Sequence, residues 1–294
     1  MKLSAVTPIQ RLREYALLMR LHRPIGILLL LWPTLWGLWF AGQGHLNLHV
    51  AAVFVLGVVL MRSAGCVIND YADRGFDPHV ERTRERPIAA GRVGPRAALV
   101  LFAVLCLVAF ALVLTLNRLT ILLSFVGAFL AATYPFLKRW THLPQFYLGV
   151  AFGWGIPMAF AAQTGAVPPL AWILFLANVC WSVAYDTAYA MVDREDDRRV
   201  GVKSTAILFG RHDRLLIGVF HALTITLLAV AGNMAGREML YYVGLGLAAG
   251  LAGYQQVLIR ERVPAGCFKA FLNNNWFGAA VFAGLVLDYL YKSF

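Results

Sequence analysis

The sequence predicts an all-α polytopic membrane protein, and two observations lead to this fold class. Of the 294 residues, 60% are hydrophobic and 14% are charged, whereas about a quarter of the residues of a soluble protein are charged. Apolar runs of about twenty residues also recur along the chain, and this is the length that a helix needs to cross the hydrocarbon core of a bilayer. We therefore predict nine transmembrane helices that form a single domain over residues 1–294.

The first 23 residues are expected to form an amphipathic lead-in on the cytoplasmic surface, before the first span. In a helix, Leu12, Tyr15, Ala16 and Met19 would share one face. The apolar run that follows lacks a small-residue cleavage site and is itself followed by further apolar runs. It therefore does not have the pattern of a removable signal peptide.

Nine apolar runs predict the membrane-spanning helices. In chain order they cover residues 25–42, 48–70, 97–114, 118–136, 146–163, 168–191, 213–231, 238–257 and 271–290. Prolines inside these runs, such as Pro33 and Pro157, indicate kinks that neighbouring helices stabilise. Acidic motifs close the second and the sixth run, four spans apart, and this spacing predicts two related four-helix units plus a ninth helix.

The basic residues indicate the orientation of the chain in the membrane. Most of them lie in the N-terminal tail and in the loops after the even-numbered runs, whereas the remaining loops and the C-terminus contain Arg118, Arg237 and Lys292 only. The positive-inside rule therefore predicts a cytoplasmic N-terminus and cytoplasmic motif loops. In a soluble protein, a net charge of +11 would indicate nucleic-acid binding. Basic residues along one membrane face instead indicate anionic lipid as the partner, with no nucleic acid.

One acidic motif directly follows the second apolar run. If the helix continues, Asn69, Asp73 and Asp77 occupy positions i, i+4 and i+8 on one face, and Asp70 lies beside that face. Because neighbouring carboxylates repel one another, a positive group is expected to hold them together. No His or Cys cluster lies nearby to provide the softer ligands of zinc, so a hard divalent cation fits these oxygen ligands best.

A second acidic motif with the same spacing closes the sixth run, and it reads Asp193-x-x-x-Asp197. It lies 120 residues after the first motif and on the same predicted side of the membrane. In proteins, Mg²⁺ takes one or two carboxylates together with waters and the phosphate oxygens of a substrate. Two facing carboxylate pairs therefore predict a site for Mg²⁺ and a diphosphate. The alternative is an acidic loop that is merely solvated.

Basic residues around the two acidic motifs are candidates for binding the same phosphates. They are Arg62, Arg74, Arg82, Arg84, Arg86, Arg194 and Lys203. Arg62 precedes Asn69 by seven residues, so it lies about two helical turns deeper in the membrane on the same face. The alternatives are a structural ion pair between Arg62 and an aspartate, and ordinary positive-inside roles for the loop residues.

The loop after the fourth run combines cations with aromatic side chains. It contains Tyr134, Lys138, Arg139 and Trp140. Arginine pairs bidentately with a carboxylate and aromatic rings offer stacking surfaces, so this loop is a candidate binding edge for an aromatic acid. The alternative is a Lys-Arg pair at the membrane interface that only anchors the chain.

Three motifs together resemble those of the membrane-embedded aromatic prenyltransferase superfamily. They are Asn69-Asp70-x-x-Asp73-x-x-x-Asp77, Tyr134-x-x-x-Lys138, and the run from Tyr185 through Tyr189 to Asp193 and Asp197. Further runs are similar to the 4-hydroxybenzoate polyprenyltransferase branch of this superfamily, which acts in ubiquinone biosynthesis; they lie at residues 23–26, 31–36, 134–139, 141–145 and 201–210. The resemblance extends over nearly the whole chain, and its aspartate pattern does not depart from that of the family.

The resemblance implies a nine-helix bundle around a central cavity, capped on the cytoplasmic side of a bacterial inner membrane. It implies an enzyme that transfers a polyprenyl group from polyprenyl diphosphate to the ring carbon ortho to the hydroxyl of 4-hydroxybenzoate. The implied cofactor is Mg²⁺, held by the catalytic carboxylates and one amide, which are Asp73, Asp77, Asp193, Asp197 and Asn69. The implied substrate-binding residues are Asn69, Asp70, Arg62, Arg74, Tyr134, Lys138, Arg139, Tyr189 and Lys203.

Within this set, we expect Arg139 to bind the acceptor carboxylate and Asp193 to take the phenolic proton. A secondary transporter fits less well, because transporters place charged groups near the bilayer midplane on broken helices, whereas these acids lie at one membrane edge. A CDP-alcohol phosphotransferase would need a Gly-Ala-Arg core among its aspartates, which is absent. The closest alternative is a prenyltransferase of the same superfamily with another aromatic acceptor, such as a naphthoate, a chlorophyllide or haem.

Overall fold

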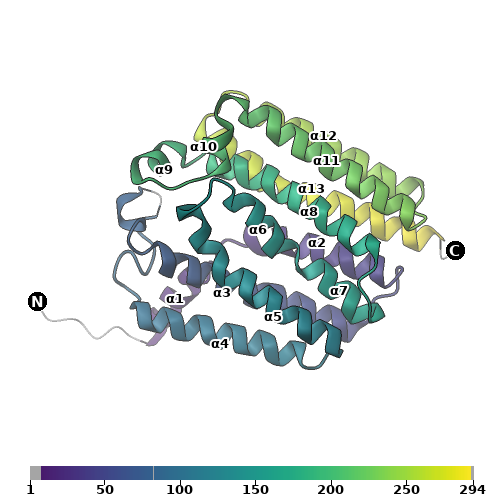
Figure 1. Ribbon diagram of the computed structural model, residues 1–294, viewed down its shortest axis with the longest axis horizontal. Coiled ribbons are helices and arrows are strands. Elements are labelled where there is room, and N and C mark those ends of the chain that lie inside the picture. Colours follow the sequence, from purple (N-terminus) through teal and green to yellow (C-terminus); the bar gives the residue numbers. More distant parts are fainter. Residues whose placement is uncertain (1–7, 82, 293–294) are drawn as a thin grey trace, which may run out of the picture.

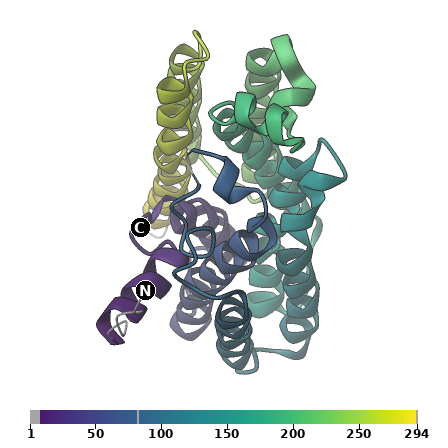
Figure 2. The same cartoon turned by 90° about the vertical axis from the view of Figure 1, so that its left-hand side faces the viewer.

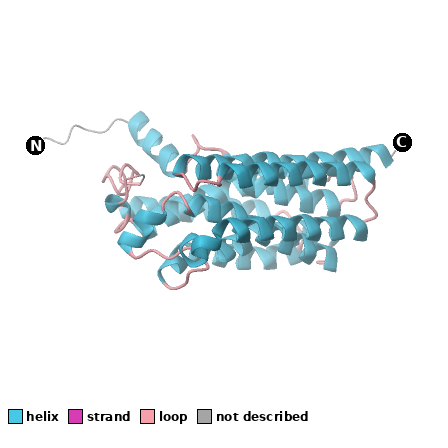
Figure 3. Cartoon of the chain, turned by 90° about the horizontal axis from the view of Figure 1, so that it is seen from above, coloured by secondary structure: helices cyan, strands magenta, loops and turns pink. Residues whose placement is uncertain are grey.

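The computed structural model describes residues 8–81 and 83–292. Within these ranges the chain forms helices joined by turns and loops, with no strand (Figures 1 and 3). The long helices run roughly parallel in one bundle. The all-α fold class is therefore confirmed.

The helices of the bundle follow one another along the two halves of the chain. The first half contains α1 (Pro8–Leu18), α2 (Ile25–Ala41), α3 (Leu48–Asp73), η1 (Asp77–His79), α4 (Pro95–Val113), α5 (Arg118–Thr133) and η2 (Tyr134–Arg139). The second half contains α6 (Pro144–Gly153), α7 (Gly155–Thr164), α8 (Pro169–Ala190), α9 (Arg194–Val200), α10 (Thr205–Phe209), η3 (Gly210–His212), α11 (Asp213–Met234), α12 (Met239–Leu258) and α13 (Pro264–Lys292).

Six helical segments among the described residues are long and apolar enough to cross a membrane. They are residues 48–73, 95–113, 118–139, 169–190, 205–234 and 264–292, and the shorter apolar helix α2 accompanies them. The protein is therefore an integral membrane protein, and the lipid bilayer is its partner. The count of nine crossings and the division into two four-helix units stay predictions.

The segment expected to form one helix over residues 146–163 is broken. α6 ends at Gly153 and α7 begins at Gly155. Pro157 has no N–H group to donate to the carbonyl of Gly153, which weakens the helix at this point. At the break, the backbone also packs closely against α8. A Cβ on Gly153 would lie 2.7 Å from Asn178 Nδ2. The kink predicted in this run is therefore a break between two helices.

Aromatic side chains from α2, α8 and α13 form the centre of the bundle. Trp36, Trp181 and Phe277 are fully buried, and the rings of Trp181 and Phe277 stack with centroids 5.4 Å apart. The indole N–H groups are satisfied, because Trp36 donates to the carbonyl of Gly278 and Trp181 donates to Asn274 Oδ1. This packing fixes α8, which carries several residues of the site described below.

The lead-in helix α1 packs against α3 through part of its predicted amphipathic face. Leu18 is fully buried against α3, and Tyr15 and Met19 pack around it, but Leu12 is 68% exposed. Leu18 therefore joins Tyr15 and Met19 in the contact with the bundle, and the amphipathic lead-in on the membrane surface stays a prediction. The first seven residues of the lead-in lie outside the described residues.

The short elements gather at one end of the bundle. Figure 1 shows α9, α10 and the loop after α3 at its left end, and Figure 2 looks onto that end. Both acidic motifs lie in these elements or at the helix ends that lead into them. The loops that carry the predicted chemistry therefore share one end of the molecule.

Candidate active site

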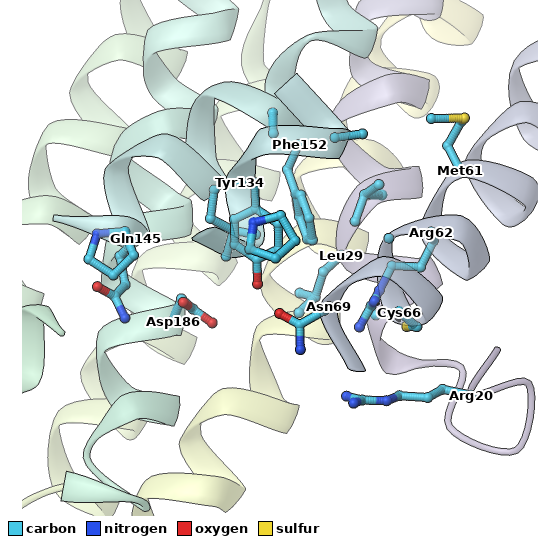
Figure 4. Close-up of a pocket in the computed structure, with 18 of the residues that line it drawn as sticks. Arg20, Leu29, Met61, Arg62, Cys66, Asn69, Tyr134, Gln145, Phe152 and Asp186 are labelled. Carbon is cyan, nitrogen blue, oxygen red and sulfur yellow. Dashed lines mark hydrogen bonds between the residues drawn. The ribbon is translucent and has the colours of Figure 1, made fainter. Parts of the chain in front are cut away.

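A cavity of about 440 Å³ lies under this end of the bundle (Figure 4). Its inner walls are apolar and come mainly from α3, α4, α5, α6 and α7, with Val53, Phe54, Phe110, Val113, Phe152 and Met158 among the lining residues. Its other end is polar and is lined by Arg20, Asn69, Asp73, Asp77, Arg86, Lys138, Gln145, Asp186, Asp193, Asp197 and Lys203. The site is therefore a charged chamber continuous with an apolar one.

The first acidic motif lies at the end of α3. The side chain of Asn69 donates a 3.0 Å hydrogen bond to Asp73 Oδ2, one turn further on. α3 ends at Asp73, and a turn leads to Asp77 at the start of η1. The helix does not continue through Asp77, which was the condition for a shared helical face, but the turn returns Asp77 to the cavity, where it is 5% exposed.

Arginine and lysine side chains neutralise these carboxylates. Arg86 donates to both carboxylate oxygens of Asp77, at 3.0 and 2.9 Å, and lies 3.2 Å from Asp70. Arg20 pairs with Asp70 at 2.6 Å, and Lys138 pairs with Asp73. The positive group that the motif required is thus provided by protein cations in this structure.

Burial and pairing act in opposite directions on Asp77. Removal from water raises the pKa of its carboxyl above the ordinary value for aspartate, and the adjacent guanidinium of Arg86 works against this rise. The neighbouring carboxylate of Asp73 adds to the rise. Burial and the Asp73 carboxylate thus oppose the ionisation of Asp77, and the Arg86 guanidinium favours it.

The second acidic motif lines the same cavity. Asp193 precedes α9 and Asp197 lies within it, and both are lining residues together with Tyr189 of α8. The segment is tied to the η2 loop, because the backbone N–H of Lys203 donates to the carbonyl of Lys138 at 3.0 Å. The structure thus brings together carboxylates that are 120 residues apart in the sequence.

Three of the predicted substrate-binding residues lie outside the cavity lining. Asp70 is 1% exposed and is held by Arg20 and Arg86. Arg74 lies on the surface with its guanidinium 4.3 Å from the ring centre of Tyr71.

Arg139 is the third such residue, and its position bears on its predicted role. Its guanidinium donates to the backbone carbonyl of Ala72 and lies 5.3 Å from the ring centre of Phe76. This arrangement fastens the η2 loop to the end of α3. The expected bond from Arg139 to the acceptor carboxylate therefore has no support from the geometry.

Other predicted phosphate-binding cations also lie away from the cavity. Arg84 pairs with Glu81 on the surface at 2.9 Å. Arg194 points to Asp213, with which it forms an ion pair. Arg82 lies outside the described residues. Of the basic candidates, Arg62, Arg86, Lys138 and Lys203 line the cavity.

The lining also contains polar residues that the motif analysis did not assign. Asp186 of α8 faces the cavity with the amide of Gln145 beside it and the hydroxyl of Tyr134 nearby (Figure 4). Gln145 is fixed, because its Oε1 accepts a 2.9 Å hydrogen bond from the backbone N–H of Thr205. An acidic residue inside an apolar run indicates a functional site. The sequence alone could therefore have identified Asp186 as a candidate.

The donor set fits Mg²⁺ that arrives with a phosphate ligand. No group of three or more His, Cys, Asp or Glu side chains in the described chain is close enough to form a preformed metal cage. One carboxylate oxygen of Asp73 is nevertheless buried without a hydrogen-bond partner among the described residues. Because Mg²⁺ takes few carboxylates and keeps oxygens from water and substrate, such a set suits it.

The sequence profile of the UbiA prenyltransferase family matches residues 30–286. The chain belongs to this family.

Close relatives extend over nearly the whole chain. The sequence is 65% identical over 281 residues to the 4-hydroxybenzoate octaprenyltransferase of Methylococcus capsulatus, covering 96% of each chain. It is 64% identical over 281 residues to the protein of the same name from Nitrosococcus oceani, covering 96% of this chain and 99% of the relative.

Solved structures share the fold. A UbiA homologue from Aeropyrum pernix superposes with a TM-score of 0.80 at 26% identity, over 89% of this chain and 97% of that one. A UbiA homologue from Archaeoglobus fulgidus, solved with GPP and Mg²⁺, gives a TM-score of 0.72 at 19% identity, over 92% of this chain and 99% of that one.

Proposed function

We propose that this protein transfers a polyprenyl group from polyprenyl diphosphate to the ring carbon ortho to the hydroxyl of 4-hydroxybenzoate. The products are 3-polyprenyl-4-hydroxybenzoate, a step of ubiquinone biosynthesis, and diphosphate. One observation carries the proposal: carboxylates from two distant segments line one end of a cavity whose other end is apolar. The names of the close relatives support the same acceptor.

The polar end of the cavity would bind the diphosphate of the donor. Asn69, Asp73, Asp77, Asp193 and Asp197 would hold Mg²⁺, which when bound offsets the negative charge of the departing diphosphate. Arg86, Lys138, Lys203 and Arg20 place further positive charge around the same chamber. These preorganised cations stabilise the charge that develops on the leaving oxygen.

The apolar end of the cavity would hold the first isoprene units of the donor. Its walls combine aliphatic and aromatic side chains from α3, α4 and α7, among them Val53, Phe54, Phe110 and Met158. They exclude water, which would otherwise capture the allylic cation formed when the C–O bond to the diphosphate breaks. A bilayer setting allows the rest of a long tail to lie in lipid.

The acceptor ring would lie between these two ends. Asp186 accepts a hydrogen bond from the phenol, which raises the electron density at the ortho carbon. That carbon bonds to the allylic carbon, and the loss of its own proton restores aromaticity. We assign this role to Asp186 in place of Asp193, because Asp193 serves the metal and Asp186 faces the cavity beside Gln145 and Tyr134.

The membrane orientation completes the proposal. We place the protein in the bacterial inner membrane as a single transmembrane domain over residues 1–294, with the lead-in and the loops of the site on the cytoplasmic side. The distribution of basic residues supports this orientation. The water-soluble acceptor would then reach the site from the cytoplasm.

The deciding experiment incubates membranes that contain the protein with Mg²⁺, isotope-labelled 4-hydroxybenzoate and a polyprenyl diphosphate. Mass spectrometry is expected to detect labelled 3-polyprenyl-4-hydroxybenzoate, and EDTA is expected to abolish it. A parallel reaction with 1,4-dihydroxy-2-naphthoate tests the other acceptor class. Prenylation of the naphthoate without prenylation of the benzoate would overturn the acceptor assignment.

A further inference from the structure

A second cavity, of about 210 Å³, lies between α11 and α12, which run side by side in Figure 1. Among the described residues, none lines both this cavity and the central one. Ala222 and Gly253 of its lining are exposed on the outer surface of the bundle, whereas His221 is 3% exposed. The cavity therefore opens toward the lipid, and His221 lies at its floor.

Both ring nitrogens of His221 are buried without a hydrogen-bond partner among the described residues. The amide of Asn274 lies near the ring but makes its hydrogen bonds elsewhere, because its Oδ1 accepts from Trp181 and its Nδ2 donates to the carbonyl of Ala270. Burial of an imidazole without a partner costs free energy. Since a neutral imidazole has one N–H donor and one acceptor nitrogen, His221 can bind a polar group that enters the cavity.

Gln256 adds a second polar group to the lining of this cavity. Its Nε2 atom is buried without a hydrogen-bond partner among the described residues. The side chain reaches toward α11, since a Cβ on Gly218 would lie 3.6 Å from Nε2. No Asp, Glu, Lys or Arg side chain of the described chain belongs to the lining. The cavity therefore offers hydrogen bonds to a neutral ligand and no counterion for a charged one.

The cavity lies in the membrane-spanning part of the bundle. His221 belongs to the apolar segment 205–234, and it lies about 12 Å along the helix axis from the start of α11 at Asp213. The surface around the opening is apolar, with Leu223 and Val257 exposed. Because a phospholipid keeps its charged phosphate at the membrane interface, a lipid-soluble molecule with a neutral head group fits this depth better.

Small side chains shape the opening of the cavity. Gly218 and Ala222 of α11 and Gly253 of α12 line it, and a Cβ on Gly253 would meet nothing within 4 Å. The ring of Phe277 lies beside that of His221, with centroids 5.8 Å apart. A flat ring with carbonyl oxygens on its edge can therefore enter between the two helices and reach the polar atoms inside.

We propose that the cavity between α11 and α12 binds the head group of a neutral prenylated quinone from the membrane. His221 and Nε2 of Gln256 can both donate a hydrogen bond, so they suit the ring carbonyls of a quinone, which only accept. The prenyl chain then lies along Ile225, which also lines the cavity, and continues into the lipid. This site goes beyond the proposed function, because it is separate from the central cavity and requires neither Mg²⁺ nor a diphosphate.

The test places the purified protein in lipid nanodiscs without Mg²⁺ or prenyl diphosphate. The probe is a fully ring-substituted benzoquinone, which does not add to thiols, and its geranyl chain carries a diazirine. Irradiation is expected to label residues 218–225 and 252–256, and an excess of the same quinone without the diazirine is expected to remove the label. His221→Leu should weaken binding about tenfold, which is the usual effect of losing one hydrogen bond. His212→Leu is the control, because it makes the same change at an exposed histidine.

Gly253→Val tests the cavity without removing a buried polar group. A Cβ on Gly253 meets nothing within 4 Å, so the added methyl groups enter the opening, and labelling should be lost. Gly250→Val is the matched control, because its Cβ also meets nothing within 4 Å while Gly250 does not line the cavity. It should keep the labelling of wild type, and the two glycine variants should have the same Tm without quinone.

Several results would overturn the proposal. One is labelling of Gly253→Val equal to that of wild type, and another is labelling that is confined to the central cavity or that excess quinone does not remove. Equal displacement of the probe by a diacylglycerol would show that the cavity takes any neutral lipid carbonyl and would overturn the choice of a quinone. If His221→Leu does not fold, the comparison of Gly253→Val with Gly250→Val still decides. Because prenylation is not measured, failure of the proposed function leaves this test intact.

Discussion

Arg262 donates hydrogen bonds to both carboxylate oxygens of Asp213, at 2.8 to 3.0 Å. Asp213 is fully buried and also accepts a hydrogen bond from Arg194. Arg194 directly follows Asp193 and begins α9, which carries Asp197. One buried carboxylate at the start of α11 therefore anchors the whole second acidic motif.

Asp213→Asn is expected to loosen α9 and so weaken the donor site, because removal of the charge leaves two arginines without their partner. The KM for polyprenyl diphosphate should rise about tenfold or more, and hydrogen exchange should increase over residues 193–203. Glu195→Gln is the control, since its ion pair with Arg198 is exposed and such pairs contribute little. Unchanged exchange in Asp213→Asn would contradict the anchoring role.

The carboxylates of both motifs should be indispensable for turnover. Asp73→Asn and Asp193→Asn are each expected to lower Mg²⁺-dependent prenylation by at least about a hundredfold, while the proteins still insert and purify as monodisperse species. Glu81→Gln, an exposed acid of the same loop region, should keep nearly full activity. Near-normal activity in either aspartate variant would remove its assignment as a metal ligand.

Arg86 is expected to stabilise the first motif before any metal binds. It lies within 4.0 Å of Asp70, Asp73 and Asp77, so Arg86→Gln leaves these carboxylates to repel one another. We expect a loss of stability on the order of 3 kcal/mol, seen as a lower Tm in metal-free detergent solution.

Mg²⁺ alone should restore part of the lost Tm in Arg86→Gln, because the added cation takes over the role of the guanidinium. Arg84→Gln is the matched control, since Arg84 is exposed and its ion pair among the described residues is with the exposed Glu81. An equal Tm for Arg86→Gln and wild type without metal would show that Arg86 does not hold the motif together.

The fold class and the acidic motifs could both be predicted from the sequence, because a bilayer constrains both. A bilayer requires long apolar runs, so the spans are visible in composition, and it penalises buried charge, so acids at the ends of spans point to a site. The pairing of the two motifs followed from their predicted side of the membrane. The structure places both in the lining of one cavity.

The remaining features depend on tertiary packing that no local pattern contains. Arg20 pairs with Asp70 from 50 residues away, and this contact requires the chain after α1 to lie against the end of α3. Arg74 lies on the surface beside the ring of Tyr71, a position that the spacing of the acidic motif does not define.

The break between α6 and α7 should be sensitive to added volume. Asn178 donates a 3.1 Å hydrogen bond to the carbonyl of Gly149, and a Cβ on Gly153 would lie 2.7 Å from the same amide nitrogen. Gly153→Ala is therefore expected to lower the stability by about 1–3 kcal/mol through overpacking, measured by thermal unfolding in detergent. Gly250→Ala, which meets no neighbour, should leave the Tm unchanged or raise it slightly. Since α6 carries Gln145, which lies beside Asp186, a Tm for Gly153→Ala equal to that of wild type would mean that this contact does not fix the cavity wall.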